Sequence, residues 1–124
     1  MTIKDFYCRL FGKYDPFEFD NYYGEILSAN EADEKILERR TAAYMSYVYI
    51  SEVMNEPDEP DIGPAFVLKD IYECPACIRY IAQVYLKGIM EGKASLFGVR
   101  NPVEEAEAKK IARRVKNRSC RFRF

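Results

Sequence analysis

The sequence predicts an all-α fold, a compact bundle of four to five helices, and three observations lead to this prediction. Apolar residues recur at helical spacing over several stretches, of which the one containing Ile36, Ala43, Tyr47 and Ile50 is the longest. Runs rich in Pro and Gly separate these stretches, as in EPDEPDIGPA at 56–65. The chain has 124 residues, 48% of them hydrophobic, which suffices for one domain with one modest core.

The N-terminal region, residues 1–29, is predicted to hold one short helix followed by an irregular segment. Thr2 and Asp5 have the spacing of a capping box, which predicts a helix that ends near Phe11. The next stretch, GKYDPFEFDNYYGE at 12–25, contains two Gly, one Pro and many aromatic residues. We expect it to be irregular and to be held in place by its rings.

A long helix is predicted over residues 30–55. Ser28 or Asn30 stands where its N-cap is expected, and three acidic residues follow in the first turn, where the helix dipole favours them. The stripe of apolar residues is wide, so much of this helix should be buried. The tyrosines of YMSYVYI at 44–50 then belong to the core, or to an interface between copies of the chain.

Residues 65–117 are predicted to form a helix–loop–helix unit. Pro75 suits the first turn of one helix and Pro102 the first turn of the other, while Gly92 is expected to end the first helix. The last segment, 118–124, alternates Cys and Phe with Arg. That alternation favours a short edge strand or a docked extended tail.

Charge is distributed unevenly along the chain. The net charge is -1, yet eight Lys and Arg and no acid occur from Lys109 onward, so residues 1–108 carry 11 bases and 20 acids, a net charge of -9. A basic tail of this kind can contact nucleic acid, which makes nucleic acid an alternative partner. Ion pairs with the acidic body and a favourable interaction with a helix dipole explain the same pattern.

The absence of His excludes several classes of active site. Ser-His-Asp and Cys-His centres and any His-containing zinc site cannot be built within one chain. No glycine-rich phosphate-binding motif is present, so we expect a protein without catalytic activity and without a cofactor.

The N-terminus interleaves charges with apolar residues, unlike a secretory signal, and no stretch is long enough to span a membrane. A cytoplasmic protein without membrane contact is expected, although a secreted chain trimmed of its signal would look the same.

Two of the four cysteines, Cys74 and Cys77, form a Cys-x-x-Cys pattern in YECPACIR. In the expected compartment the cysteines are thiols rather than disulfides. The helix that follows would lower the pKa of Cys74, which favours a redox role, although no strand pattern precedes Cys74 as it does in thiol oxidoreductases. A zinc site would require Cys8 and Cys120 to join the pair. The simplest interpretation is that Cys77 packs as a small apolar residue.

Residues 68–115 resemble one repeat of the S-layer homology family. That family's repeat has a Phe, an Asp and a Trp, a helix ending in Gly-Ile, a second Gly, a Phe turn, and a second helix beginning with a hydrophobic residue and Thr-Arg-Ala-Glu. Here Asp70 occupies the Asp position, Ile81 and Gly88 keep the seven-residue separation, Gly92 is the second Gly and Phe97 marks the turn. Leu68, Ala76 and Val99 replace the family's Phe, Trp and Pro, respectively.

A second, partial match makes about one and a half repeats. LERRTAA at 37–43 looks like the start of another repeat's second helix and places Arg39 at the motif Arg. Family members bind cell-wall polysaccharide between repeats with that Arg, the Trp and a loop Gly. The resemblance therefore implies ligand contacts only at Arg39 and Gly92, because the other motif Arg is Glu105 here and a third repeat is missing. We expect a binding or assembly module that associates with itself or another protein, with polysaccharide less favoured.

Overall fold

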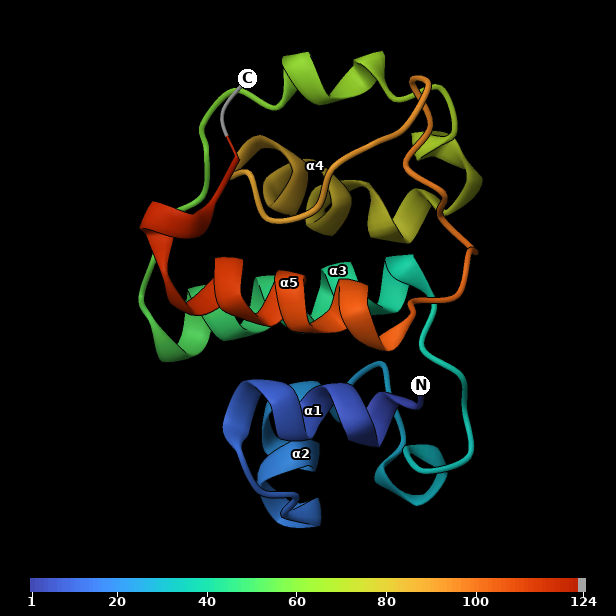
Figure 1. Cartoon of the computed structure of the whole chain (residues 1–124), viewed down its shortest axis with the longest axis vertical. Helices are drawn as coiled ribbons and strands as arrows, with labels where there is room; N and C mark the ends of the chain where they lie inside the picture. The colour runs from blue at the N-terminus through green and yellow to red at the C-terminus, as the bar shows by residue number, and fades with distance from the viewer. Residues whose placement is uncertain (123–124) are drawn as a thin grey trace.

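The computed structural model describes residues 1–122, whose helices lie in three layers (Figure 1). Helices α1 (Ile3–Phe11) and α2 (Pro16–Tyr23) form one end of the molecule, α3 (Arg39–Val48) and α5 (Glu105–Lys116) form the middle layer, and α4 (Ile78–Leu86) lies on the other side of α3. Residues 1–122 contain isolated β-bridges but no strand, so the all-α prediction is confirmed. The remaining elements are short: η1 (Ala29–Glu31), the π-helical η2 (Tyr49–Val53), η3 (Gly63–Val67), η4 (Ile71–Glu73), η5 (Pro75–Cys77) and η6 (Arg118–Cys120).

The capping box at the N-terminus is confirmed, but the expectation of an irregular segment after α1 is wrong. Thr2 Oγ1 accepts the Asp5 N–H at 3.2 Å, and the Asp5 carboxylate accepts the Thr2 N–H at 2.9 Å. The aromatic stretch that follows forms α2. Asp15 caps this helix by accepting the N–H groups of its first turn, and Pro16 occupies the first helical position, where its missing N–H costs nothing.

The long helix begins at Arg39 and not near residue 30, which corrects the predicted boundary. Residues 32–38 instead bond to backbone elsewhere in the chain. Ile3 N–H donates to Lys35 O at 3.1 Å, and Leu37 lies between two neighbours, donating to Met1 O at 3.0 Å and accepting from Val103 N–H at 2.9 Å. These tertiary hydrogen bonds, together with the complete burial of Leu37, outweigh the local preference of this acidic segment for helix.

The helix–loop–helix unit is present, but its boundaries and glycines differ from the prediction. Helix α4 ends at Leu86, and Gly88, with φ of +76°, reverses the chain there. Gly92 therefore does not end a helix. A Cβ at Gly92 would lie 2.7 Å from Leu68 Cδ2, so this glycine permits close packing of the loop. Pro102 does not open α5 either, because it forms a β-bridge with Glu38 before α5 begins at Glu105.

Aromatic residues from α1, α2 and α3 fill the lower part of the core. The rings of Tyr7 and Phe19 lie 5.4 Å apart, and those of Phe19 and Tyr23 lie 5.5 Å apart. The Tyr23 hydroxyl donates to Met45 O at 2.9 Å, and burial raises the pKa of Tyr23. Tyr44, Met45, Tyr47 and Ile50 are buried, so within this monomer the YMSYVYI tyrosines at those positions are core residues.

The C-terminal segment docks against the body without forming a strand in its described part. Residues 118–120 form η6, and Phe122 N–H then donates to Gly88 O at 3.1 Å. The docked-tail alternative is thus the one observed up to Phe122. Arg123 and Phe124, which the predicted edge strand also included, lie outside the described residues.

Candidate functional site

Arg39 and Gly92, the two predicted ligand-binding residues, line the same hollow. It encloses about 710 Å³ between the start of α3 and the loop at 91–102. These positions are 53 residues apart in the sequence, and the fold brings them together because α3 begins beside that loop.

The guanidinium of Arg39 nevertheless forms hydrogen bonds and an ion pair with other groups of the same chain. Its Nε donates to Phe97 O at 2.7 Å, its Nη2 donates to Glu91 O at 2.6 Å, and its Nη1 forms an ion pair with Glu107. The guanidinium carbon also lies 4.8 Å from the centre of the Phe97 ring. Only 8% of Arg39 is exposed, so its main role is to clamp the loop against α5.

Asp70 holds the other side of the same loop. Its carboxylate accepts three consecutive backbone N–H groups, from Phe97 at 2.7 Å, Gly98 at 2.8 Å and Val99 at 3.3 Å. Burial raises the pKa of Asp70, but these hydrogen bonds outweigh burial and the net pKa is lowered. The loop is therefore fixed from both sides, by Asp70 and by Arg39. Sequence reasoning aligned Asp70 with the family motif but assigned it no role.

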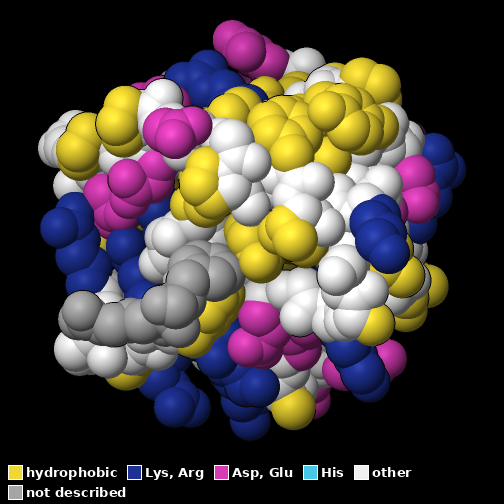
Figure 2. All heavy atoms as spheres, turned by 90° about the horizontal axis from the view of Figure 1, so that it is seen from above, with side chains coloured by type: hydrophobic (Ala, Val, Ile, Leu, Met, Phe, Trp, Pro, Cys, Tyr) yellow, Lys and Arg dark blue, Asp and Glu magenta, His cyan; other side chains and the backbone are white. Residues whose placement is uncertain are grey.

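One end of the molecule carries a patch of exposed large apolar side chains, here called the apical face. Figure 2 looks onto this end and shows hydrophobic side chains gathered there. The patch comprises Phe66, Val67, Tyr72 and Leu96, with exposed fractions of 38, 54, 65 and 46%, respectively. The rings of Phe66 and Tyr72 stack with centroids 5.6 Å apart. The sequence did not predict this face, because one-turn helices such as η3 and η4 are too short to show the periodic spacing of apolar residues that identifies an amphipathic helix.

Cys74 and Cys77 form a disulfide, which corrects the expectation of thiols, while both cysteines also pack against the core as expected for Cys77. Their Cα atoms are 5.2 Å apart, and the bridge closes the η5 turn directly before α4. Cys8 and Cys120 are free. Within residues 1–122, no three His, Cys, Asp or Glu side chains gather as a metal site would require, so the four cysteines are not assembled for zinc.

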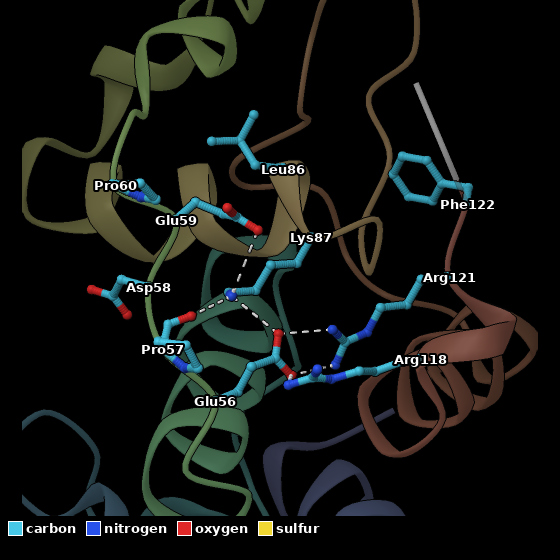
Figure 3. Close-up of a pocket in the computed structure, with 10 residues that line it drawn as sticks. All are labelled: Glu56, Pro57, Asp58, Glu59, Pro60, Leu86, Lys87, Arg118, Arg121 and Phe122. Carbon is cyan, nitrogen blue, oxygen red and sulfur yellow. Dashed lines mark hydrogen bonds and ion pairs between the residues drawn. The ribbon is translucent and has the colours of Figure 1, made fainter.

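A buried cluster of charges lies where the C-terminal segment meets the body (Figure 3). Both carboxylate oxygens of Glu56 accept hydrogen bonds from Arg121, at 2.8 and 2.9 Å, and Lys87 Nζ lies 3.0 Å from Glu56. Each of these three side chains is at most 8% exposed. Burial raises the pKa of Glu56, but hydrogen bonds from Arg121 and Lys87 outweigh it and bring the pKa to about 2. Part of the basic tail thus pairs with the acidic body.

No family model matches this chain, and comparisons with curated proteins and with solved structures gave no match either. The S-layer homology resemblance therefore stays a prediction. Within the described part of the chain, no helix combines the length and the apolar character needed to cross a bilayer.

Proposed function

We propose that this protein is a non-catalytic assembly module that pairs with a second copy of itself through the apical face. The observation that carries the proposal is the group of exposed apolar side chains at positions 66, 67, 72 and 96. A contiguous apolar patch on a small protein commonly marks an interaction surface. Aromatic anchors such as Phe66 and Tyr72 contribute much of the binding energy in protein interfaces.

Hydrogen bonds within the fold hold part of the apical face in place, which favours association. Leu96 belongs to the loop that Asp70 and Arg39 fix, and Leu68 packs beneath that loop against Gly92. A preorganised surface loses little conformational entropy when it binds. The loop that carries Leu96 can therefore dock without rearrangement of its backbone.

Exposed charges of both signs accompany the apical face. Lys69 and Lys93 are exposed next to the patch, and so are the acidic Asp61 and Glu73. A two-fold dimer places the same surface on both partners, so a surface that carries both signs can pair its own charges across the axis. A surface of one sign would repel its copy.

The resemblance to S-layer homology repeats supports the same proposal. Members of that family form their grooves between successive repeats, and this chain has the equivalent of about one and a half. A second copy would supply the missing partner surface. Glu105 occupies a position where the family has Arg, which favours assembly over recognition of an anionic sugar.

Sedimentation equilibrium over a wide concentration range tests the proposal, with Val67→Glu as the interface variant. A carboxylate within the face should convert the dimer to a monomer, because burying it without a partner is unfavourable. Phe17→Glu is the matched control, since Phe17 is 86% exposed on α2 at the opposite end of the molecule. A wild-type protein that stays monomeric at high concentration rules out self-assembly.

A second candidate function is the binding of an uncharged polysaccharide in the hollow, favoured by the convergence of Arg39 and Gly92 there. Co-sedimentation with polysaccharide-bearing cell walls tests it. Arg39→Ala removes the predicted contact, and Arg100→Ala changes an exposed residue of the same hollow without removing the loop clamp. Binding that both substitutions weaken supports this function, and the absence of wild-type binding excludes it.

A further inference from the structure

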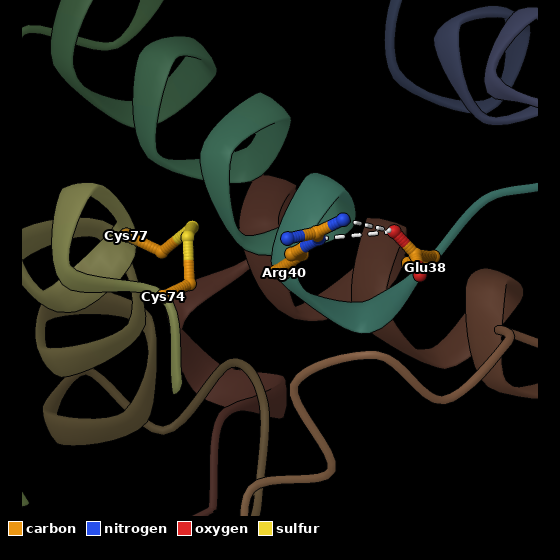
Figure 4. Close-up of a disulfide and its surroundings, with 4 residues drawn as sticks. All are labelled: Glu38, Arg40, Cys74 and Cys77. Carbon is orange, nitrogen blue, oxygen red and sulfur yellow. Dashed lines mark hydrogen bonds and ion pairs between the residues drawn. A yellow bond between two sulfur atoms is a disulfide. The ribbon is translucent and has the colours of Figure 1, made fainter. Parts of the chain in front are cut away.

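The Cys74–Cys77 disulfide lies in the wall of a groove that the apical face does not include. The groove encloses about 320 Å³ between η5, the start of α3 and the turn after α2. Figure 4 shows the disulfide on the side of η5 that faces the first turn of α3. We propose that this pair is a thiol–disulfide exchange site, and that its substrate is an acidic, extended peptide with two cysteine thiols.

The groove is apolar where a peptide would lie along the disulfide. Tyr44 and Tyr80 line it from α3 and α4, and their rings are in contact with centroids 4.9 Å apart. Ile26 and Ile36 line it as well and are more than half exposed. Large exposed apolar side chains beside a partly exposed disulfide provide contact area for a peptide whose cysteine must reach the sulfurs.

The charged residues of the groove favour thiolates and acidic peptides. Lys35 and Arg40 line it, and Glu38 is the only acidic residue in its lining. Arg40 Nη2 lies 2.9 Å from Glu38 Oε1, while Lys35 Nζ lies 2.8 Å from Glu31 Oε2. The lining residues alone therefore sum to +1 (Lys35 and Arg40 against Glu38), and the partner of Lys35, Glu31, lies outside the lining. The thiolate, not the thiol, is the attacking and leaving species in exchange, so a cationic surrounding promotes both steps.

The position of the pair before α4 adds to this effect. The η5 turn leads directly into the nine residues of α4, so both sulfurs lie at the N-terminal end of a helix. The positive end of the helix dipole lowers the free energy of a thiolate released there. The disulfide shows that the two sulfurs are placed to bond, which an exchange site requires.

The exchange proceeds in two balanced steps. A thiolate of the peptide attacks one sulfur of the Cys74–Cys77 bridge, which forms a mixed disulfide and releases the other cysteine as a thiolate. The second peptide thiolate then attacks the peptide sulfur of the mixed disulfide, which closes a disulfide within the peptide and releases the first protein cysteine. The peptide loses two electrons and two protons, and the protein disulfide becomes a dithiol.

The test uses the full chain with Cys8→Ser and Cys120→Ser, so that only the proposed pair can react. The oxidised protein is mixed with a reduced synthetic peptide that has two cysteines among glutamates, and mass spectrometry follows the transfer of two hydrogen atoms. The reference is the oxidised octapeptide YECPACIR, which has the same cysteine ring without the fold. We expect the protein to react at least about tenfold faster than this octapeptide, because the groove attracts the acidic peptide.

A groove variant separates this proposal from ordinary disulfide reactivity. Arg40→Gln should slow the reaction of the glutamate peptide more than that of a glutamine analogue. Arg100→Gln, which changes an exposed cation outside the groove, is the control. The proposal is overturned if the protein is no faster than the octapeptide, or if Arg40→Gln affects both peptides equally.

Discussion

Replacing Glu56 by Gln probes the buried charge cluster that fastens the C-terminal segment. The substitution keeps the size of the side chain but removes its charge, so that Lys87 and Arg121 remain buried without their anion. Removing one partner of a buried ion pair costs about 3–5 kcal/mol. A pKa of about 2, against an ordinary 4.5, corresponds independently to about 3 kcal/mol of stabilisation of the charged form. We therefore expect Glu56→Gln to lower the free energy of unfolding by about 3 kcal/mol.

Urea denaturation at pH 7 measures this loss. With a denaturant dependence of about 1.5 kcal/mol per molar urea, the midpoint should fall by about 2 M. Glu59→Gln is the matched control, because Glu59 lies 4.0 Å from Lys87 Nζ and is about half exposed. Its loss should stay below about 1 kcal/mol.

The dependence on pH gives a second, independent check. Because the folded pKa of Glu56 is lowered, its stabilisation is fully present above pH 4.5 and is lost as the pH falls from 4.5 toward 2. The difference in stability between wild type and Glu56→Gln should shrink over that range. A difference under about 1 kcal/mol at pH 7, or one that does not change down to pH 2, would refute the reasoning.

Three further substitutions test local features by urea denaturation. Gly88→Ala should lower the free energy of unfolding by about 1–3 kcal/mol more than Gly12→Ala does. Both glycines have positive φ, but only a Cβ at Gly88 would overlap the docked tail. Equal losses for the two substitutions would contradict this. Ser46→Ala should be neutral or stabilise by up to about 1 kcal/mol, since Ser46 Oγ is buried with no hydrogen-bond partner within residues 1–122; a clear loss argues for a missed partner. Arg39→Lys should lower the free energy of unfolding by about 2–4 kcal/mol, because lysine cannot make all the hydrogen bonds with which Arg39 holds the loop. Arg40→Lys changes a half-buried surface ion pair and should lower it by under about 1 kcal/mol. Similar losses for the two substitutions would contradict the role of Arg39 in holding the loop.

The helices that the sequence predicts best are those with local signals. Helix α1 follows from the capping box of Thr2 and Asp5, and the apolar stripe of α5 is visible in its spacing. The start of α2 also had a local signal, since Asp15 followed by Pro16 is typical of a helix N-terminus. The glycines and the aromatic composition of that segment favoured an irregular structure instead, and that expectation was wrong.

The start of α3 was not predictable from local sequence. The acidic residues near position 31 suit a helix N-terminus, but Lys35 and Leu37 bond to backbone at positions 3, 1 and 103. Those partners are defined only by the tertiary structure. The motif aligned Arg39 and Gly92 with binding positions, whereas the burial of Arg39 depends on carbonyl groups more than 50 residues away.

The disulfide was missed for a different reason. The spacing of Cys74 and Cys77 permits a bridge, but the expected reducing compartment argued for thiols. The apical face was missed because exposure in short 3₁₀ turns follows from packing and not from periodicity.

The proposed self-association is tested most directly by hydrogen–deuterium exchange at low and high protein concentration. Backbone amides in residues 63–72 and 93–97 should gain protection as the concentration rises, because dimerisation covers the apical face. Amides in residues 16–24, on α2 at the opposite end, should exchange at the same rate throughout. Exchange at the apical face that does not depend on concentration would contradict the account.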